Sequence, residues 1–287
     1  MFNICILVLI YNKKPFESRT INSLKKYHNN LNNCSITIWN NGPNTILPLS
    51  TSPNDDLKIG DCEINIIETI QNTALSEVYN TFIKNNNSNK YVILDDDSEL
   101  TNEYIQAINT LELSDIAFPL ITCKRKARSP IIDNCIQSNT GTVSEKQNIL
   151  AIGSGMTINK RTISALNNYF GNVFDERFRF YGVDITFCYR INKIRKNEKF
   201  QVTIIDGFEH SLSKMEVESR EIKNFRRKER SYDLALRLKY YYTKPYSLLI
   251  LSKAILTSIK NNFFSKESKY NYADLLKAYF SGKHYKD

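Results

Sequence analysis

Four apolar or aromatic residues are followed directly by three carboxylates in the segment Tyr91-Val92-Ile93-Leu94-Asp95-Asp96-Asp97-Ser98. The apolar half is typical of a strand in a parallel sheet, where both faces are covered. Because an unpaired buried charge is very costly, the acids must emerge at the carboxyl end of that strand. Ligands bind at that edge of open α/β sheets, and Mg²⁺ and Mn²⁺ prefer such oxygen ligands. The segment therefore predicts a metal site at a sheet edge, with a solvated acidic turn as the alternative.

Strands and helices alternate around this segment. Strands are expected at residues 3–10, 35–39, 64–67, 115–120 and 201–205, and helices at 16–27, 73–85 and 101–111. Pro15 stands near the start of the first helix, where proline is favoured. Asn40-Asn41-Gly42-Pro43 after the second strand is a strong turn signal. This alternation predicts a Rossmann-like, mostly parallel sheet flanked by helices.

Two later segments have less regular patterns. Residues 123–148 are polar and partly basic, which favours a solvated loop; a lip that contacts a bound diphosphate or a second ligand is the alternative. The apolar run from Ile149 to Ile152 continues into Gly153-Ser154-Gly155, which predicts a strand whose backbone approaches a ligand closely. The glycine spacing does not match a phosphate-binding GxGxxG loop.

Composition and charge divide the chain into two parts. Of its 287 residues 41% are hydrophobic, enough for a core, and its six cysteines lack the spacing of a disulfide framework or zinc site. The opening apolar run is too short to span a bilayer, so a cytoplasmic protein is expected. Residues 1–225 are electrically neutral, whereas residues 226–287 hold 14 Lys or Arg and five Asp or Glu. We therefore expect a catalytic domain over 1–225 and a basic helical extension over 226–287.

Over residues 3–235 these features together resemble the family 2 glycosyltransferases, inverting enzymes of the GT-A fold. The matching motifs are Leu9-Ile10-Tyr11-Asn12 after the first strand, Asn40-Asn41-Gly42-Pro43 after the second, Asn72-Thr73-Ala74-Leu75-Ser76-Glu77-Val78-Tyr79-Asn80 at a helix start, and the DxD at Asp95-Asp96-Asp97. Two positions depart from the family pattern. Asn40 replaces an acid that usually contacts the nucleotide base, which leaves the base preference open, and Ala74 replaces a glycine.

The resemblance implies roles for individual residues. Asp95 and Asp97 would hold Mn²⁺ or Mg²⁺, with His210 after the last strand as a further ligand. The nucleotide-sugar donor would be contacted by Tyr11, Asn40, Asn72, Asp95 and Asp96. Arg226, Arg227 and Arg230 would meet the diphosphate, or simply begin the basic tail.

The same resemblance assigns the general base to Asp184. The family carries an acidic pair that opens a helix with an arginine a few residues later; here the pair is Val183-Asp184, with Arg190 downstream. Val-Asp after the Phe-Asp-Glu of residues 174–176 also occurs in the rhamnosyltransferase-like branch of bacterial surface-polysaccharide enzymes. The alternative is that Asp184 caps the helix, because Asp is a favoured N-cap residue.

The expected activity is transfer of a hexose or deoxyhexose from a nucleotide sugar to a glycan, as in O-antigen or capsule synthesis. The acceptor would be lipid-linked. A nucleotidyltransferase of similar fold is the first rival, but it would not need the Asp184 segment and usually has a Gly-rich basic loop after the first strand. A nucleic-acid-binding module would explain the basic tail, but acids at the central strand would repel phosphate. We therefore expect no nucleic-acid partner.

The tail contains an apolar helical pattern. Leu248, Leu251, Ile255, Ile259 and Phe263 recur at steps of three and four, with Lys253 and Lys260 on one flank. The helix either packs this face onto the catalytic domain or lies on a membrane, with its lysines toward anionic lipid. The concentrated positive charge favours peripheral attachment to the inner face of the cell membrane.

Overall fold

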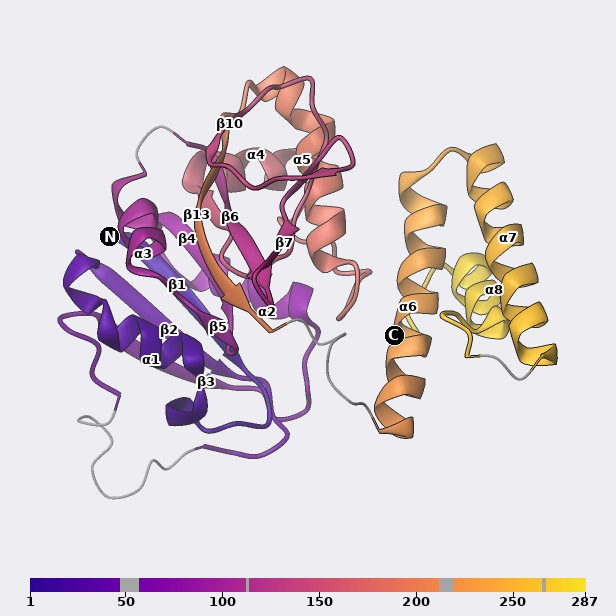
Figure 1. Ribbon diagram of the computed structural model, residues 1–287, viewed down its shortest axis with the longest axis horizontal. Coiled ribbons are helices and arrows are strands. Elements are labelled where there is room, and N and C mark those ends of the chain that lie inside the picture. The colour runs from indigo at the N-terminus through magenta and orange to yellow at the C-terminus, as the bar shows by residue number, and fades with distance from the viewer. Residues whose placement is uncertain (47–56, 112–113, 212–218, 265–266) are drawn as a thin grey trace.

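A computed structural model describes residues 1–46, 57–111, 114–211, 219–264 and 267–287. Within these residues the largest sheet has ten strands in the order β10-β13-β6-β12-β4-β1-β2-β3, with β5 paired to β13 and β7 to β6. Its strands are β1 (Phe2–Ile10), β2 (Cys34–Asn40), β3 (Glu63–Glu68), β4 (Ser88–Asp95), β5 (Ser98–Glu99), β6 (Ile116–Cys123), β7 (Lys126–Ser129), β10 (Gly141–Val143), β12 (Thr157–Asn159) and β13 (Val202–His210). Helices flank the sheet, and the last three helices of the chain stand to one side of it (Figure 1).

Both faces of the sheet are covered by apolar side chains. Successive residues of β1 point to opposite faces, so Leu7 joins one buried cluster and Ile6 the other. The first cluster is closed by helices α2 (Leu75–Asn85), α4 (Lys160–Phe170) and α5 (Val183–Glu198), and the second by α1 (Arg19–Lys26) and α3 (Asn102–Thr110). This is why the sequence of the central strands is apolar without alternation.

The sheet is mostly parallel, as predicted, with one inserted antiparallel strand. β4, β1, β2 and β3 run parallel to one another, and β13 runs parallel to β6. The short β12 lies between β4 and β6 and is antiparallel to both. The carboxyl ends of the parallel strands therefore share one edge, where the acids that follow β4 lie.

Several boundaries differ from the sequence-based predictions. The first helix begins at Arg19, because Pro15–Glu17 forms a separate 3-10 turn (η1) and the Ser18 hydroxyl accepts the N–H of Ile21 as the helix cap. A second short 3-10 turn, η2 (His28–Asn30), follows that helix. The last strand continues past residue 205 to His210, with an irregularity between Ile205 and Phe208 where it pairs with β6.

The segment 123–148 is not the irregular loop that its polarity suggested. It contains β7, β10 and two short strands, β8 (Ile131–Ile132) and β9 (Cys135–Ile136). In a separate three-stranded sheet β8 pairs with β9 on one side and with β11 (Ile149–Leu150) on the other. The strand predicted from Ile149 to Ile152 is shorter in the structure, where β11 ends at Leu150. Polar residues form these hairpins because strand pairing satisfies their backbone groups while their side chains remain in water.

The C-terminal part is a unit of three helices, α6 (Arg220–Tyr241), α7 (Lys244–Phe263) and α8 (Tyr272–Ser281). They bury a separate apolar cluster that includes Tyr232, Leu251 and Leu275. The expected domain boundary at residue 226 falls inside α6. This helix lies between the α/β part and α7 (Figure 1), and the Tyr241 hydroxyl donates to Asp175 Oδ2 at 2.6 Å.

Candidate active site

Strand pairing brings the residues that end β1, β2 and β4 to one edge of the sheet. Leu9 of β1 lies beside Asp95 of β4, and Ile10 lies beside Asn40 of β2. His210 reaches the same edge from another part of the chain, because β13 pairs with the short β5 and sets His210 opposite Ser98. The edge thus collects side chains that are more than a hundred residues apart in sequence.

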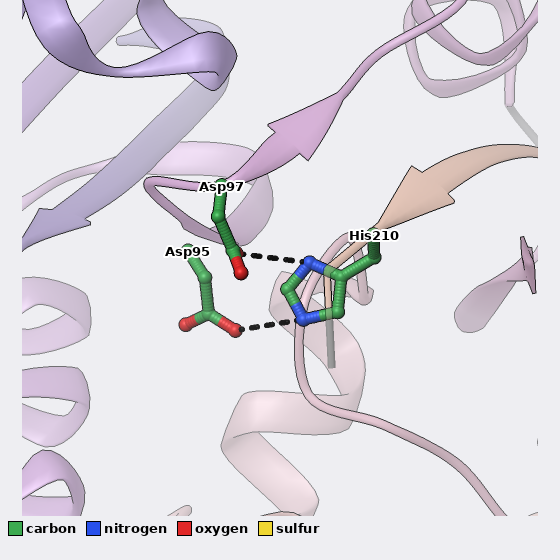
Figure 2. Close-up of side chains that lie close together, drawn as sticks. All are labelled: Asp95, Asp97 and His210. Atoms are coloured by element: carbon green, nitrogen blue, oxygen red, sulfur yellow. Dashed lines mark ion pairs between the residues drawn. The ribbon is translucent and has the colours of Figure 1, made fainter. Parts of the chain in front are cut away.

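Asp95, Asp97 and His210 form a compact cluster. His210 Nδ1 lies 3.0 Å from Asp97 Oδ1, and His210 Nε2 lies 3.6 Å from Asp95 Oδ2. Figure 2 shows each carboxylate facing one nitrogen of the imidazole ring. The Ser211 hydroxyl donates to Asp97 Oδ2 at 2.6 Å, which holds the second carboxylate in place.

Burial and neighbouring charges act differently on the three groups. Burial, together with the nearby negative charges, outweighs the attraction of His210 and raises the pKa of Asp95 to about 6. Burial also acts to raise the pKa of Asp97, but its hydrogen bond to His210 prevails and lowers it. The pKa of His210 is raised because these carboxylates outweigh the effect of burial. The cluster therefore sets two carboxylates against one imidazole.

The cluster fits a divalent metal ion. One ligand atom from each of Asp95, Asp97 and His210 lies within 4.8 Å of the others. Mn²⁺ binds both carboxylate oxygens and imidazole nitrogens, whereas Mg²⁺ prefers the carboxylate oxygens. Burial is the main cause of the raised pKa of Asp95, and the neighbouring carboxylates add to it, so a bound cation would stabilise the ionised form.

Asp96, between the two carboxylates of the cluster, is held by the N-terminal loop. Lys13 Nζ lies 2.7 Å from Asp96 Oδ1, and the backbone N–H of Tyr11 donates to Asp96 Oδ2 at 3.4 Å. The Tyr11 side chain itself is exposed at this edge. The structure therefore brings Tyr11 and Asp96 together beside the acidic cluster.

The amide of Asn40 is engaged within the protein. Its Nδ2 donates to the carbonyl of Asn44 and to Glu68 Oε1, both at 2.7 Å, and its Oδ1 accepts the N–H of Gly42. Both hydrogens of the Nδ2 group are engaged, so a nucleotide base could add a bond to this amide only by donating to Oδ1. The loop before α2 is held instead by the neighbouring Asn41, which donates to Asn72 Oδ1 and accepts the N–H of Thr73.

Asp184 is the second residue of α5 and is half-buried. The N-cap of this helix is Gly182, so the alternative role of Asp184 as N-cap is wrong; Asp184 Oδ1 instead accepts the N–H of Ile185 at 2.8 Å. Burial raises the pKa of Asp184, and its negative charge contributes to the raised pKa of Asp95. A side chain at Gly153 would meet Asp184 Cβ at 3.5 Å, so the Gly-Ser-Gly segment lies directly beside this acid.

Two residues of the site were not named as site residues from the sequence. The Ser154 hydroxyl accepts the backbone N–H of Asp95 at 3.1 Å and bonds the Ser98 hydroxyl at 3.0 Å. Lys13 pairs with Asp96, and only its place after the first strand could have indicated it. Of the three arginines expected near a diphosphate, Arg230 lies over the ring of Tyr181, and Arg227 donates to Asn224.

Comparison with solved structures identifies the fold. Scans against protein-family models and curated protein sequences find no match. The chain superimposes on fragment 1–349 of TarS from S. aureus with a TM-score of 0.51 and 12% identity, covering 98% of this chain and 72% of that one. The same fragment in complex with UDP gives 0.51 and 12%, with coverage of 92% and 72%. A longer TarS structure gives 0.52 and 12%, with coverage of 92% and 44%.

At this level of identity the similarity establishes the fold alone. It is the GT-A arrangement expected from the sequence, a mostly parallel sheet flanked by helices. The fold prediction is therefore confirmed, and the activity has to be argued from the site.

Proposed function

We propose that this protein is a metal-dependent inverting glycosyltransferase that moves a sugar from a nucleotide-sugar donor to a glycan acceptor. The observation that carries the proposal is the convergence of Asp95, Asp97 and His210 at the carboxyl edge of the sheet, with Asp184 close enough to influence Asp95. The complex of TarS with UDP supports a nucleotide ligand for this fold. Asp95, Asp97 and His210 would hold Mn²⁺ or Mg²⁺.

The chain's own residues account for the remaining chemistry. When bound, the metal ion would supply positive charge for the diphosphate leaving group. Asp184 takes the proton of an acceptor hydroxyl as the bond from that oxygen to the anomeric carbon forms and the bond to the diphosphate breaks. One displacement inverts the stereocentre, so no protein nucleophile is required. The raised pKa of Asp184 suits this role, because a more basic carboxylate accepts a proton more readily.

The finer assignments rest on the resemblance to family 2 enzymes. We propose a hexose or deoxyhexose donor, the latter because of the rhamnosyltransferase-like segment at residues 174–184. The proposed acceptor is a lipid-linked glycan of a bacterial surface polysaccharide such as O-antigen or capsule. Such an acceptor would place the reaction at the inner face of the cell membrane.

The test is a panel of UDP-, dTDP- and GDP-sugars with Mn²⁺, followed by thermal stabilisation and by release of nucleoside diphosphate. We expect one donor class to stabilise the protein and to release nucleoside diphosphate, and Asp97→Ala or excess EDTA to abolish both effects. Formation of a nucleoside triphosphate and a sugar 1-phosphate when pyrophosphate is added would indicate a nucleotidyltransferase instead. Full activity of Asp97→Ala, or of the wild type in EDTA, would refute the metal-dependent mechanism.

A further inference from the structure

Helix α7 is packed on one side only. Ser247, Leu251 and Ser258 are buried toward α6 and α8, and the Ser258 hydroxyl donates to the carbonyl of Tyr270 at 2.8 Å. Ile255 packs against the same apolar cluster. The sequence pattern predicted a single apolar face, but its residues lie on two sides of the helix. Leu251 and Ile255 face inward, whereas Leu248, Ile259 and Phe263 are exposed.

The other side of α7 exposes an apolar surface that we call the α7 stripe. It consists of Leu248, Leu249, Leu256, Ile259 and Phe263, whose side chains are between 46% and 82% exposed. Leu249, Leu256 and Phe263 are seven residues apart, so they align along the helix. Among the described residues no other helix or strand exposes more than three large hydrophobic side chains. Such concentration on a single face indicates a contact surface rather than the usual scatter of exposed apolar residues.

Positive charge borders the α7 stripe. Lys253 and Lys260 are exposed and follow Leu249 and Leu256 by four residues, so each lysine lies beside a leucine of the stripe. The helix carries no acidic residue. The surrounding 226–287 segment holds the whole net charge of the protein, +9. A partner for this face must therefore be apolar at its centre and negative at its border.

We propose that the α7 stripe docks this protein onto an anionic lipid membrane. No described helix is long and apolar enough to cross a membrane, but an amphipathic helix can lie in the interface with its apolar side chains among the acyl chains and its lysines at the headgroups. A second copy of the chain fits less well, because symmetric packing would bring two strongly positive segments together. α7 lies on the side of the three-helix unit that faces away from the sheet (Figure 1), so docking leaves the acidic edge accessible.

Docking to a membrane rests on the proposed function, because a lipid-linked acceptor gives the enzyme a reason to be there. The test of docking needs neither donor nor acceptor. Full-length protein is sedimented with vesicles of phosphatidylcholine alone and with vesicles in which a third of the lipid is phosphatidylglycerol. We expect binding to the anionic vesicles that salt weakens in part, because only the electrostatic contribution is screened. Failure of this binding would refute the docking surface and leave the transferase proposal untouched.

Paired variants separate the two contributions. Leu249→Gln/Leu256→Gln should reduce binding about tenfold or more, through loss of buried apolar area. Lys253→Gln/Lys260→Gln should reduce binding roughly tenfold and lower its salt dependence, because each lysine near an anionic surface contributes appreciably. The matched controls are Ile136→Ser, an exposed apolar residue outside the tail, and Lys84→Gln/Lys146→Gln, which removes the same charge from the α/β part; both should bind as the wild type does.

Self-association is measured on the same proteins by sedimentation equilibrium. All the variants change exposed side chains, so we expect them to fold and to keep the stability of the wild type. Circular dichroism checks this. A wild-type dimer that Leu249→Gln/Leu256→Gln converts to a monomer, without vesicle binding by either, would assign the α7 stripe to contact between copies and overturn the proposal. Equal loss of binding in the controls would also overturn it, since general charge would then suffice.

Discussion

The three consecutive acids have different partners in the structure, and their pKa values differ as a result. The run of three acids predicts that a cation is required, but not which carboxylates converge. In the structure Asp95 and Asp97 face His210, while Asp96 pairs with Lys13. The difference in their pKa shifts, upward for Asp95 and downward for Asp97, follows from this arrangement.

The first prediction concerns the pH dependence of metal binding. A bound ion requires Asp95 to be ionised and His210 to be neutral. Because the pKa of Asp95 is about 6 in the metal-free protein, its proton competes with the metal below that pH, and the raised pKa of His210 extends the competition upward. The apparent affinity for Mn²⁺ should therefore rise steeply between pH 5.5 and 8, as measured by electron paramagnetic resonance titration. An affinity that is flat across this range would contradict the assignment of these ligands.

The second prediction concerns Asp184. Asp184→Asn retains an oxygen that can accept the N–H of Ile185, so α5 should form normally. The amide cannot take the proton of the acceptor hydroxyl, and turnover should fall by roughly 10²-fold or more. Binding of UDP with Mn²⁺, measured by calorimetry, should remain near the wild-type value. If turnover is also unchanged, the base lies elsewhere and Asp184 has a structural role.

The position of Asp184 depends on how α5 begins. Its N-cap, Gly182, has a φ of +83°, a left-handed conformation that glycine adopts without steric cost. The Asp233 carboxylate of α6 packs against this glycine, and Asp233 pairs with Arg237 four residues further on. The helix that carries the proposed base is therefore set in place by a helix of the C-terminal unit.

The third prediction tests this junction with two glycines of similar conformation. An alanine Cβ at Gly182 would overlap Asp233 Oδ1, whereas at Gly171, with a φ of +81°, it would meet nothing within 4 Å. Gly171→Ala should cost roughly 1–2 kcal/mol of unfolding free energy, from the left-handed conformation alone. Gly182→Ala should cost clearly more and should also lower turnover, because α5 must shift to relieve the contact. Urea denaturation measures both losses of unfolding free energy. Equal losses for the two variants would show that Asp233 moves aside at little energetic cost.

The α/β part and the three-helix unit are joined by a buried polar cluster. Asp175, only 2% exposed, accepts bonds from Arg177 and Tyr241, and Arg190 Nη2 lies 3.4 Å from its Oδ2. Nearby, the Tyr189 hydroxyl bonds the Tyr242 hydroxyl at 2.8 Å. At the end of the chain, Asp287 pairs with Arg179 of the loop that precedes α5. These contacts position the C-terminal unit against the segment that carries Asp184.

The fourth prediction concerns the stability that Asp175 contributes. Asp175→Asn leaves Arg190 buried without its counter-charge and should cost about 3 kcal/mol at pH 7. Although burial acts in the opposite direction, the bonds from Arg177 and Tyr241 lower the pKa of Asp175. A lowered pKa stabilises the folded protein above the ordinary carboxyl pKa of about 4, and this stabilisation is lost as the pH falls through the folded value.

The difference in unfolding free energy between wild type and Asp175→Asn should therefore be constant from pH 7 to 5 and should shrink below about pH 4. Urea denaturation at pH 7, 5 and 3.5 measures it. Asp61→Asn, at an exposed loop position, is the matched control and should show no comparable difference. A cost that stays the same at pH 3.5 would mean that shape, rather than charge, is what Asp175 contributes.

The sequence by itself determined the apolar strands of the main sheet, the acidic residues at its edge and the basic helical tail. These features depend on local patterns: apolar runs that must be buried, charges that cannot be, and a helical period that separates polar from apolar positions. The family resemblance added His210 and Asp184 as candidates, but no spacing in the chain shows that His210 lies 3.0 Å from Asp97.

Only the tertiary structure decided what lies against what. β13 pairs with β5 and so delivers His210 to the acids, β12 inserts antiparallel between β4 and β6, and polar residues in 123–148 pair as strands. In α7 a period of 3.6 residues identifies apolar positions on several sides of the helix without saying which of them a neighbour covers. Packing against α6 and α8 covers Leu251 and leaves Leu256 in solvent, because contacts between distant segments depend on the complete fold rather than on any local pattern.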